Sequence, residues 1–240
     1  MAEYLTEVSL PSRGFFNPEL KGKKIVMDML DFECEKTAFG STSEESLDFI
    51  LKHCIKSPEI NLDSLTQEDK NFLLWKLRIH SYGSSYYARV TFPSGIHEMK
   101  VNLDDVEIKE LPDDFQMPSG VLPLSKNTVV IHHLTVGEFK KLREYCKDKA
   151  EKLNKPYSEV FYEASFVKRI ESVNGEKLNF SDALRFVNDL RGVDLAYIDH
   201  LSKKVDFGFT SRVKVKSPEY GDGEGIVRIT SEFFRPVFDD

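Results

Sequence analysis

Apolar and polar side chains alternate in several short stretches of the first half of the chain, which predicts β-strands because successive strand residues face opposite sides. The first such stretch covers residues 23–34. The segments 87–92 and 97–103 flank Pro93-Ser94-Gly95 and predict a β-hairpin. Residues 66–79 instead place apolar side chains on most sides of a helix, so we expect this helix to be the central one of its half.

A helical pattern dominates the second half. Thr135 and Glu138 have the spacing of a capping box, in which each side chain bonds the backbone N–H of the other residue, and apolar residues follow at helical intervals. Further helices are predicted from Pro156 and over residues 181–190 and 194–201.

Two turn signals follow in the same half. Asn174-Gly175 predicts a tight hairpin turn. The tail over residues 205–229 alternates again and predicts a second hairpin, in which the glycine-rich run Gly221–Gly225 forms a solvated turn between strands. This run carries two acids and no lysine, so it does not resemble a phosphate-binding loop.

The segment 113–127 is rich in proline and predicts a domain boundary. It separates an N-terminal half (1–112) with the first hairpin from a C-terminal half (128–240) with the second. The two halves show a weak internal similarity, because each runs from helices into a hairpin with Pro and Gly at its turn. The predicted fold class is α+β, with two helix-plus-β-hairpin halves that have either one shared core or two.

The charge balance narrows the possible partners. The 240 residues include 33 Lys and Arg and 40 Asp and Glu, which gives a net charge of −7. Nucleic-acid binding and attraction to anionic membranes both need clustered positive charge, so we expect neither. The N-terminus lacks a basic region followed by an apolar one, so no secretory signal is expected.

The cysteines and histidines predict no metal site. Cys34, Cys54 and Cys146 are far apart and form no CxxC pair, which fits a reduced cytoplasmic compartment. His80 and His97 could approach each other around the first hairpin, with Cys34 or Cys54 nearby, but no zinc-ligand spacing supports this. We find no catalytic constellation either, and we expect neither cofactor nor enzymatic activity.

Phenylalanine pairs lie near both ends of the chain, beside an arginine and a proline. Terminal segments normally fray, so ends this apolar must pack on the protein's own core or on another protein. Both alternatives stay open for the phenylalanines. Aromatic residues and Arg are frequent interface anchors, and the candidate partner contacts are therefore Arg13, Phe15, Phe16, Phe233, Phe234 and Arg235.

Several phrases together resemble the baseplate proteins of T4-type contractile-tailed bacteriophages, the family that contains baseplate hub assembly proteins. The resemblance rests on the order and spacing of phrases along nearly the whole chain, none of which is a catalytic signature. These phrases are Leu10–Phe16, Asp69–Gly83, Asn102–Glu107, Glu110–Pro112, His133–Glu138 and Phe233–Pro236.

This chain departs from the family pattern at the turn of its first hairpin. Relatives often have a CxxC-type turn in the first hairpin, as in a zinc ribbon, where this chain has Phe92-Pro93-Ser94-Gly95. The hairpins therefore resemble zinc ribbons that have lost their cysteines and are held by packing instead.

What the resemblance implies is a non-enzymatic late viral protein. We expect a chaperone-like assembly factor or a structural subunit of the baseplate hub, working in the host cytoplasm and either leaving or staying in the virion. The implied partners are other hub, spike or tape-measure proteins. The alternatives are a degenerate zinc-ribbon nucleic-acid-binding protein and a tail-associated hydrolase acting on peptidoglycan.

Overall fold

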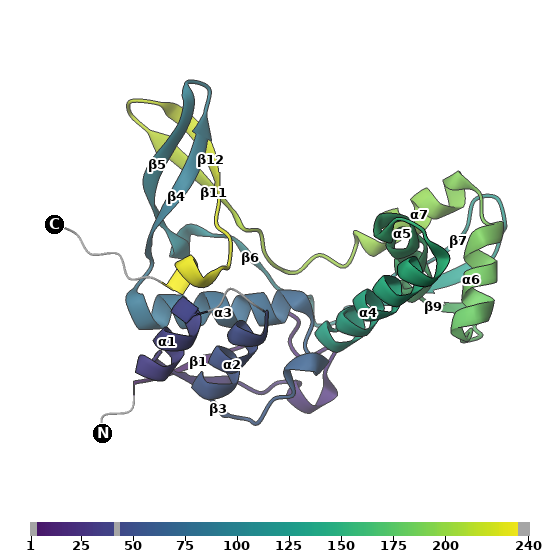
Figure 1. Ribbon diagram of the computed structural model, residues 1–240, viewed down its shortest axis with the longest axis horizontal. Coiled ribbons are helices and arrows are strands. Elements are labelled where there is room, and N and C mark those ends of the chain that lie inside the picture. The colour runs from purple at the N-terminus through teal and green to yellow at the C-terminus, as the bar shows by residue number, and fades with distance from the viewer. Residues whose placement is uncertain (1–3, 41–43, 235–240) are drawn as a thin grey trace. The chain divides into compact units, whose positions relative to one another are not determined.

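The computed structural model describes residues 4–40 and 44–234 (Figure 1). These residues form seven α-helices and several small antiparallel sheets, which confirms the α+β class. The chain divides into two compact units. Unit 1 consists of Met1–Leu62, Gln67–Leu111 and Phe207–Asp240, and unit 2 consists of Asp63–Thr66 and Pro112–Asp206.

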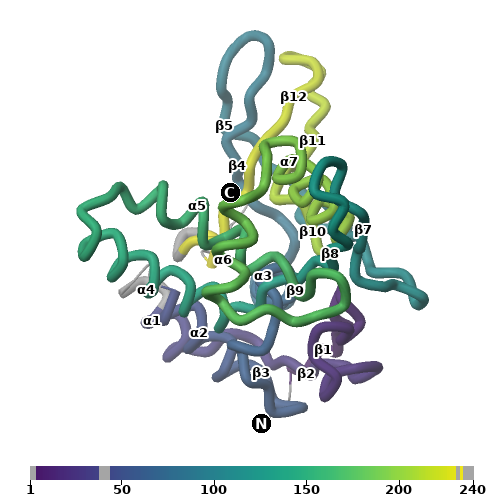
Figure 2. The backbone as a smooth tube through the Cα atoms, turned by 90° about the vertical axis from the view of Figure 1, so that its right-hand side faces the viewer, coloured from purple at the N-terminus to yellow at the C-terminus, as the bar shows by residue number. Residues whose placement is uncertain are grey.

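The described part of unit 1 contains three α-helices, one of them longer than the others, and short 3-10 turns, one of which lies near its C-terminal end. The helices are α1 (Phe32–Gly40), α2 (Glu44–Cys54), α3 (Gln67–Tyr82) and the 3-10 turn η4 (Ser231–Phe234). The strands β1 (Leu5–Val8), β2 (Ile25–Asp28) and β3 (Ile55–Ser57) form one sheet, and β6 (Ile108–Lys109) pairs with β10 (Gly208–Phe209). Figure 2 shows β1, β2 and β3 side by side.

The predicted central helix is confirmed as α3. Leu73, Leu74, Trp75 and Leu77 have no solvent exposure, as the apolar pattern on most sides of the helix requires. The same helix also buries charged side chains. The ammonium of Lys70 forms ion pairs with Asp48 and Glu44 of α2, while the Arg78 guanidinium bonds backbone carbonyls.

The two predicted hairpins belong to one sheet. They are β4 (Ser85–Phe92) with β5 (Gly95–Asn102), and β11 (Arg212–Ser217) with β12 (Gly221–Ile226). Strand β12 pairs with β4, so the strand order is β11-β12-β4-β5 (Figure 1). The assignment of one hairpin to each half, and with it the C-terminal half 128–240, is therefore wrong: the last segment of the chain returns to unit 1.

The glycine-rich run is part of a strand rather than a turn. Gly221–Gly225 lies within β12, and its alternate glycines face the neighbouring strand β4. A Cβ at Gly223 would lie 2.5 Å from the ring of Phe92 and 2.8 Å from the side chain of Val90. Glycine is required here because the larger side chains of β4 fill the space.

The long strand predicted over residues 23–34 is also wrong. Strand β2 ends at Asp28, and α1 begins at Phe32. Asp31 caps this helix, because its Oδ1 accepts a hydrogen bond of 3.0 Å from the backbone N–H of Cys34. A single capping aspartate thus outweighs the alternating pattern that precedes it.

Unit 2 combines one small sheet with four helices. The sheet has the order β7-β8-β9, with strands Ser119–Val121, Thr128–Ile131 and Ile170–Val173. The helices are α4 (Val136–Leu153), α5 (Tyr157–Lys168), α6 (Phe180–Asp189) and α7 (Gly192–Ser202), close to the predicted ranges. The predicted capping box of Thr135 and Glu138 is present at the start of α4.

The segment 113–127 is not a simple linker. Its residues 119–121 form β7, which pairs with β8, and Leu122 is buried in the core of unit 2. The carboxylate of Asp194, itself buried, accepts hydrogen bonds of 2.8 Å from Leu124 N–H and 3.1 Å from Ser125 N–H. The prolines shape this segment without detaching it, because its backbone has these fixed partners.

Candidate functional site

Residues 10–16, here called the N-terminal loop, are anchored on α3 by a buried carboxylate. Asp69 Oδ1 accepts a hydrogen bond of 3.1 Å from Ser12 N–H, and Asp69 Oδ2 accepts one of 2.5 Å from the Ser12 hydroxyl. Ser12 and Asp69 are both buried. Because a buried carboxylate needs such donors, the loop and the helix stabilise each other.

The middle of this loop has a left-handed backbone. Arg13 has a φ of 53° and Gly14 a φ of 74°. A Cβ at Gly14 would lie 2.6 Å from the backbone nitrogen of Lys21, so no other residue fits without moving the chain. The loop therefore has one defined shape, with Gly14 as its pivot.

This shape divides the candidate contacts of the loop between surface and interior. The exposed guanidinium of Arg13 forms an ion pair of 2.9 Å with Glu110. Phe16 is half-buried and stacks on Phe207 with a ring distance of 5.5 Å, while Phe15 lies edge-on to Phe16 and keeps 39% of its surface exposed. Arg13 and Phe15 are thus the members of the set that the fold presents to solvent.

The C-terminal pair has a different environment. Phe233 and Phe234 are 0% and 1% exposed, and the Phe233 ring stacks 5.3 Å from that of Trp75. Their assignment as partner contacts is wrong for the folded chain, since a fully buried ring cannot reach a partner. Arg235 lies outside the described residues.

A buried arginine fixes this C-terminal segment. Arg78 of α3 donates hydrogen bonds of 2.8 Å to the Phe233 carbonyl, 2.6 Å to the Gly83 carbonyl and 3.0 Å to the Ser85 carbonyl. Burial lowers the pKa of Arg78, and these carbonyl dipoles stabilise its charge. One side chain thereby joins the end of α3, the start of β4 and the C-terminal segment.

Phrases that are distant in the sequence meet around α3. Leu111 N–H donates a hydrogen bond of 2.9 Å to the Pro11 carbonyl, and Trp75 Nε1 donates one of 3.3 Å to the Leu103 carbonyl. The segments around residues 10–16, 69–83, 102–112 and 233–234 therefore form a single packed region of unit 1.

Rings hold the two hairpin tips of the four-stranded sheet together. His97 stacks on Tyr220 with a ring distance of 3.9 Å, and Phe92 lies 5.5 Å from the ring of Tyr220. Packing of these three side chains joins the turn of the first hairpin to that of the second. The likeness of the hairpins to zinc ribbons stays a prediction.

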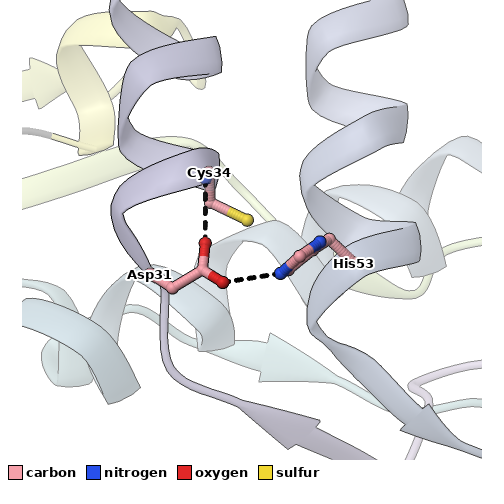
Figure 3. Close-up of side chains that lie close together, drawn as sticks. All are labelled: Asp31, Cys34 and His53. Carbon is pink, nitrogen blue, oxygen red and sulfur yellow. Dashed lines mark hydrogen bonds and ion pairs between the residues drawn. The ribbon is translucent and has the colours of Figure 1, made fainter.

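The histidines considered at the first hairpin do not meet. His80 Nε2 lies 2.6 Å from the Tyr4 carbonyl oxygen, whereas His97 belongs to the hairpin tip. A different group brings metal-ligating atoms together: Asp31, Cys34 and His53, whose ligand atoms all lie within 4.8 Å of one another (Figure 3).

Sequence reasoning missed Asp31 and His53 as members of this group. The available signal was the short spacing Asp31-x-x-Cys34 and the adjacency of His53 to Cys54. The hydrogen bond from Cys34 N–H, followed by the contact with His53, lowers the pKa of Asp31, so its carboxylate is charged near neutral pH.

A second histidine–carboxylate pair serves the capping box of unit 2. His132 Nε2 lies 3.0 Å from Glu138 Oε2, and Thr135 N–H donates a hydrogen bond of 2.9 Å to the same oxygen. These two partners lower the pKa of Glu138 to about 2 despite its partial burial. The ionised carboxylate of Glu138 stabilises the start of α4.

Comparisons with known proteins give one match. Searches of curated protein sequences and of solved structures found nothing similar. Among the described residues, no helix combines the length and the apolar character needed to cross a membrane. The family described as T4 bacteriophage base plate protein matches residues 17–235, which is nearly the whole chain, and the chain therefore belongs to this family of phage baseplate proteins.

Proposed function

We propose that this baseplate protein acts in the assembly of the baseplate hub, as a chaperone-like factor or as a structural subunit, and that it works through protein–protein contacts without catalysing a reaction. The family match over residues 17–235 is the observation that carries this proposal. We propose other hub, spike or tape-measure proteins as its partners and the host cytoplasm as the place of assembly.

The N-terminal loop is the contact surface that we propose. Its backbone is fixed by Asp69 and Gly14, so it loses little conformational entropy when a partner binds. It presents an exposed aromatic ring at Phe15 and an exposed guanidinium at Arg13. These are residue types that supply a large share of the binding energy in protein interfaces.

Co-expression with each hub, spike and tape-measure protein of the same phage tests this proposal. We expect affinity capture of the full chain to recover at least one of them, and the double substitution Arg13→Ala, Phe15→Ala to reduce recovery at least about tenfold, since two anchor residues together contribute more than 1.4 kcal/mol. Tyr87→Ala is the control, because Tyr87 is 46% exposed on β4, away from the loop in sequence. Failure to capture any of these proteins, together with normal tail assembly in a phage that lacks the gene, would contradict the proposal.

Purified virions separate the two forms of the proposal. A structural subunit remains in the finished baseplate and is detected there by mass spectrometry at a fixed ratio to other hub proteins. An assembly factor is present in infected cells and in baseplate intermediates but absent from virions.

A further inference from the structure

Four side chains that could bind a metal gather where α1 begins and α2 ends. Asp31 directly precedes α1 and Cys34 lies in its first turn, and His53 and Cys54 are the last two residues of α2. Figure 3 shows the carboxylate of Asp31 between Cys34 and the imidazole of His53. The ligand atoms of these three residues lie within 4.8 Å of one another. Cys54 Sγ lies 3.7 Å from Cys34 Sγ but is not within 4.8 Å of all three ligand atoms, so it joins them only by a movement of its side chain.

The distance between the two sulfur atoms suits one tetrahedral ion. With Zn–S bonds of about 2.3 Å, two thiolates on a tetrahedral zinc ion are separated by about 3.7 Å. The two cysteines are free and fully buried. They already have the spacing of two zinc ligands before any ion is considered.

The two remaining ligands are oriented by other contacts. Asp31 Oδ1 accepts the hydrogen bond from Cys34 N–H, which leaves Oδ2 directed at His53 Nε2 at 2.7 Å. The ring of Phe49 stacks on that of His53 at 5.9 Å. Such partners behind the ligands are what fixes ligand orientation in metal sites.

An ion would enter by replacing one hydrogen bond. Oxygen and nitrogen ligands of a tetrahedral zinc ion are about 3.3 Å apart, so the Asp31–His53 contact must open by about 0.6 Å. Both side chains are partly exposed. Their exposed side also provides the route by which an ion reaches the buried sulfurs.

The local charges favour a cation. Two thiolates and one carboxylate exceed the charge of a divalent ion by one. Lys56 is the nearby cation: its Nζ donates a hydrogen bond of 3.1 Å to the His53 carbonyl and also lies 3.9 Å from Asp28 Oδ2. The ligand set of two thiolates, one imidazole and one carboxylate is typical of zinc rather than magnesium or calcium.

We propose that Asp31, Cys34, His53 and Cys54 bind a single Zn²⁺ ion, which joins the start of α1 to the end of α2. The site is structural, because all four positions are filled by protein ligands and none is left for a substrate. It lies away from the N-terminal loop in the sequence, and it does not depend on the assembly role proposed above.

Cobalt titration of the reduced, chelator-treated full-length protein tests the site. We expect one equivalent of Co²⁺ to give the intense visible bands of a tetrahedral complex and a thiolate-to-cobalt charge-transfer band, and one equivalent of Zn²⁺ to abolish both. His53→Gln should weaken Co²⁺ binding by more than the roughly 10–100-fold typical of a residue behind the ligands. Cys34→Ser should abolish the charge-transfer contribution of one thiolate.

Two controls keep this test decisive. Cys146→Ser removes a buried cysteine of unit 2 and should leave the spectrum unchanged. His53→Gln alters a partly exposed side chain and should fold normally by circular dichroism, even if Cys34→Ser does not. The proposal is overturned if the reduced wild-type protein gives no tetrahedral spectrum, or if the spectrum survives unchanged in a folded His53→Gln protein.

Discussion

The two phenylalanine pairs have similar sequences and opposite environments. Phe233 and Phe234 are buried against α3, with Trp75 as a ring partner and Arg78 on the Phe233 carbonyl. Phe15 and Phe16 lie on a loop whose left-handed backbone turns one ring toward the surface and the other toward Phe207.

The difference shows that the backbone around an apolar pair decides its role. The C-terminal pair follows a strand of the four-stranded sheet and ends in a 3-10 turn beside the central helix, so both rings enter the core. The N-terminal pair follows the buried Gly14, whose left-handed backbone belongs to a series of tight turns. The same residue types therefore stabilise the fold at one end and form a candidate contact at the other.

The largest expected effect on stability comes from removing the buried ring of Phe233. Phe233→Ala should lower the free energy of unfolding by about 3–5 kcal/mol, because it removes a fully buried ring and leaves a cavity beside Trp75. Denaturant unfolding measures this change. Phe32→Ala is the control, since Phe32 is 75% exposed and its loss should change stability by no more than about 0.5 kcal/mol. Equal losses of unfolding free energy in Phe233→Ala and Phe32→Ala would contradict the core role of Phe233.

A smaller effect is expected where the N-terminal loop is anchored. Ser12→Ala removes the hydroxyl that donates to the buried Asp69 carboxylate, and it should cost about 1–3 kcal/mol. Hydrogen exchange should then become faster in residues 10–16 than in α3. Unchanged exchange in the loop would mean that Asp69 does not hold its shape.

The exposed ring of Phe15 should contribute much less to stability than the buried ring of Phe233. Phe15→Ala should lower stability by no more than about 1 kcal/mol, because surface substitutions outside a buried network have small effects. Its effect should instead be on partner capture, as proposed for the loop. A loss of stability comparable to that of Phe233→Ala would show that Phe15 also serves the core.

The smallest effect is expected at the ion pair of the loop. Arg13→Ala breaks the exposed contact with Glu110 and should change stability by about 0–1 kcal/mol, with the difference fading as salt is raised. Thermal unfolding at low and high salt measures it, with Lys155→Ala as a second exposed ion pair for reference. A larger loss that persists in high salt would assign Arg13 a role in packing.

Local sequence signals predicted most of the secondary structure. The capping box at Thr135 and Glu138 and the helix 66–79, which is apolar on most sides, were identified correctly, because each depends on interactions within one or two turns of chain. The strand predicted over residues 23–34 failed at Asp31, where a cap outweighs an alternating pattern. The turn predicted at residues 221–225 was wrong because the glycines there make room for Phe92 and Val90 of another strand.

The candidate site was only partly accessible from the sequence. The pattern of aromatic and arginine residues selected the two ends of the chain, but it could not separate Phe15 from Phe233, since each begins a pair of adjacent phenylalanines near an arginine and a proline. The group of Asp31, Cys34 and His53 depends on two helices that meet in space. Neither distinction is contained in the spacing of residues along one segment.

The α+β class, the central helix, the capping box and the membership in a phage baseplate family could be derived from the sequence, since these rest on periodicity, short-range contacts and the order of phrases. Tertiary structure alone decided that the second hairpin joins the first, that residues 119–121 pair as a strand, and that one phenylalanine pair is buried while Phe15 is exposed. The physical reason is that strand pairing and burial depend on partners far away in the chain, which local patterns do not specify.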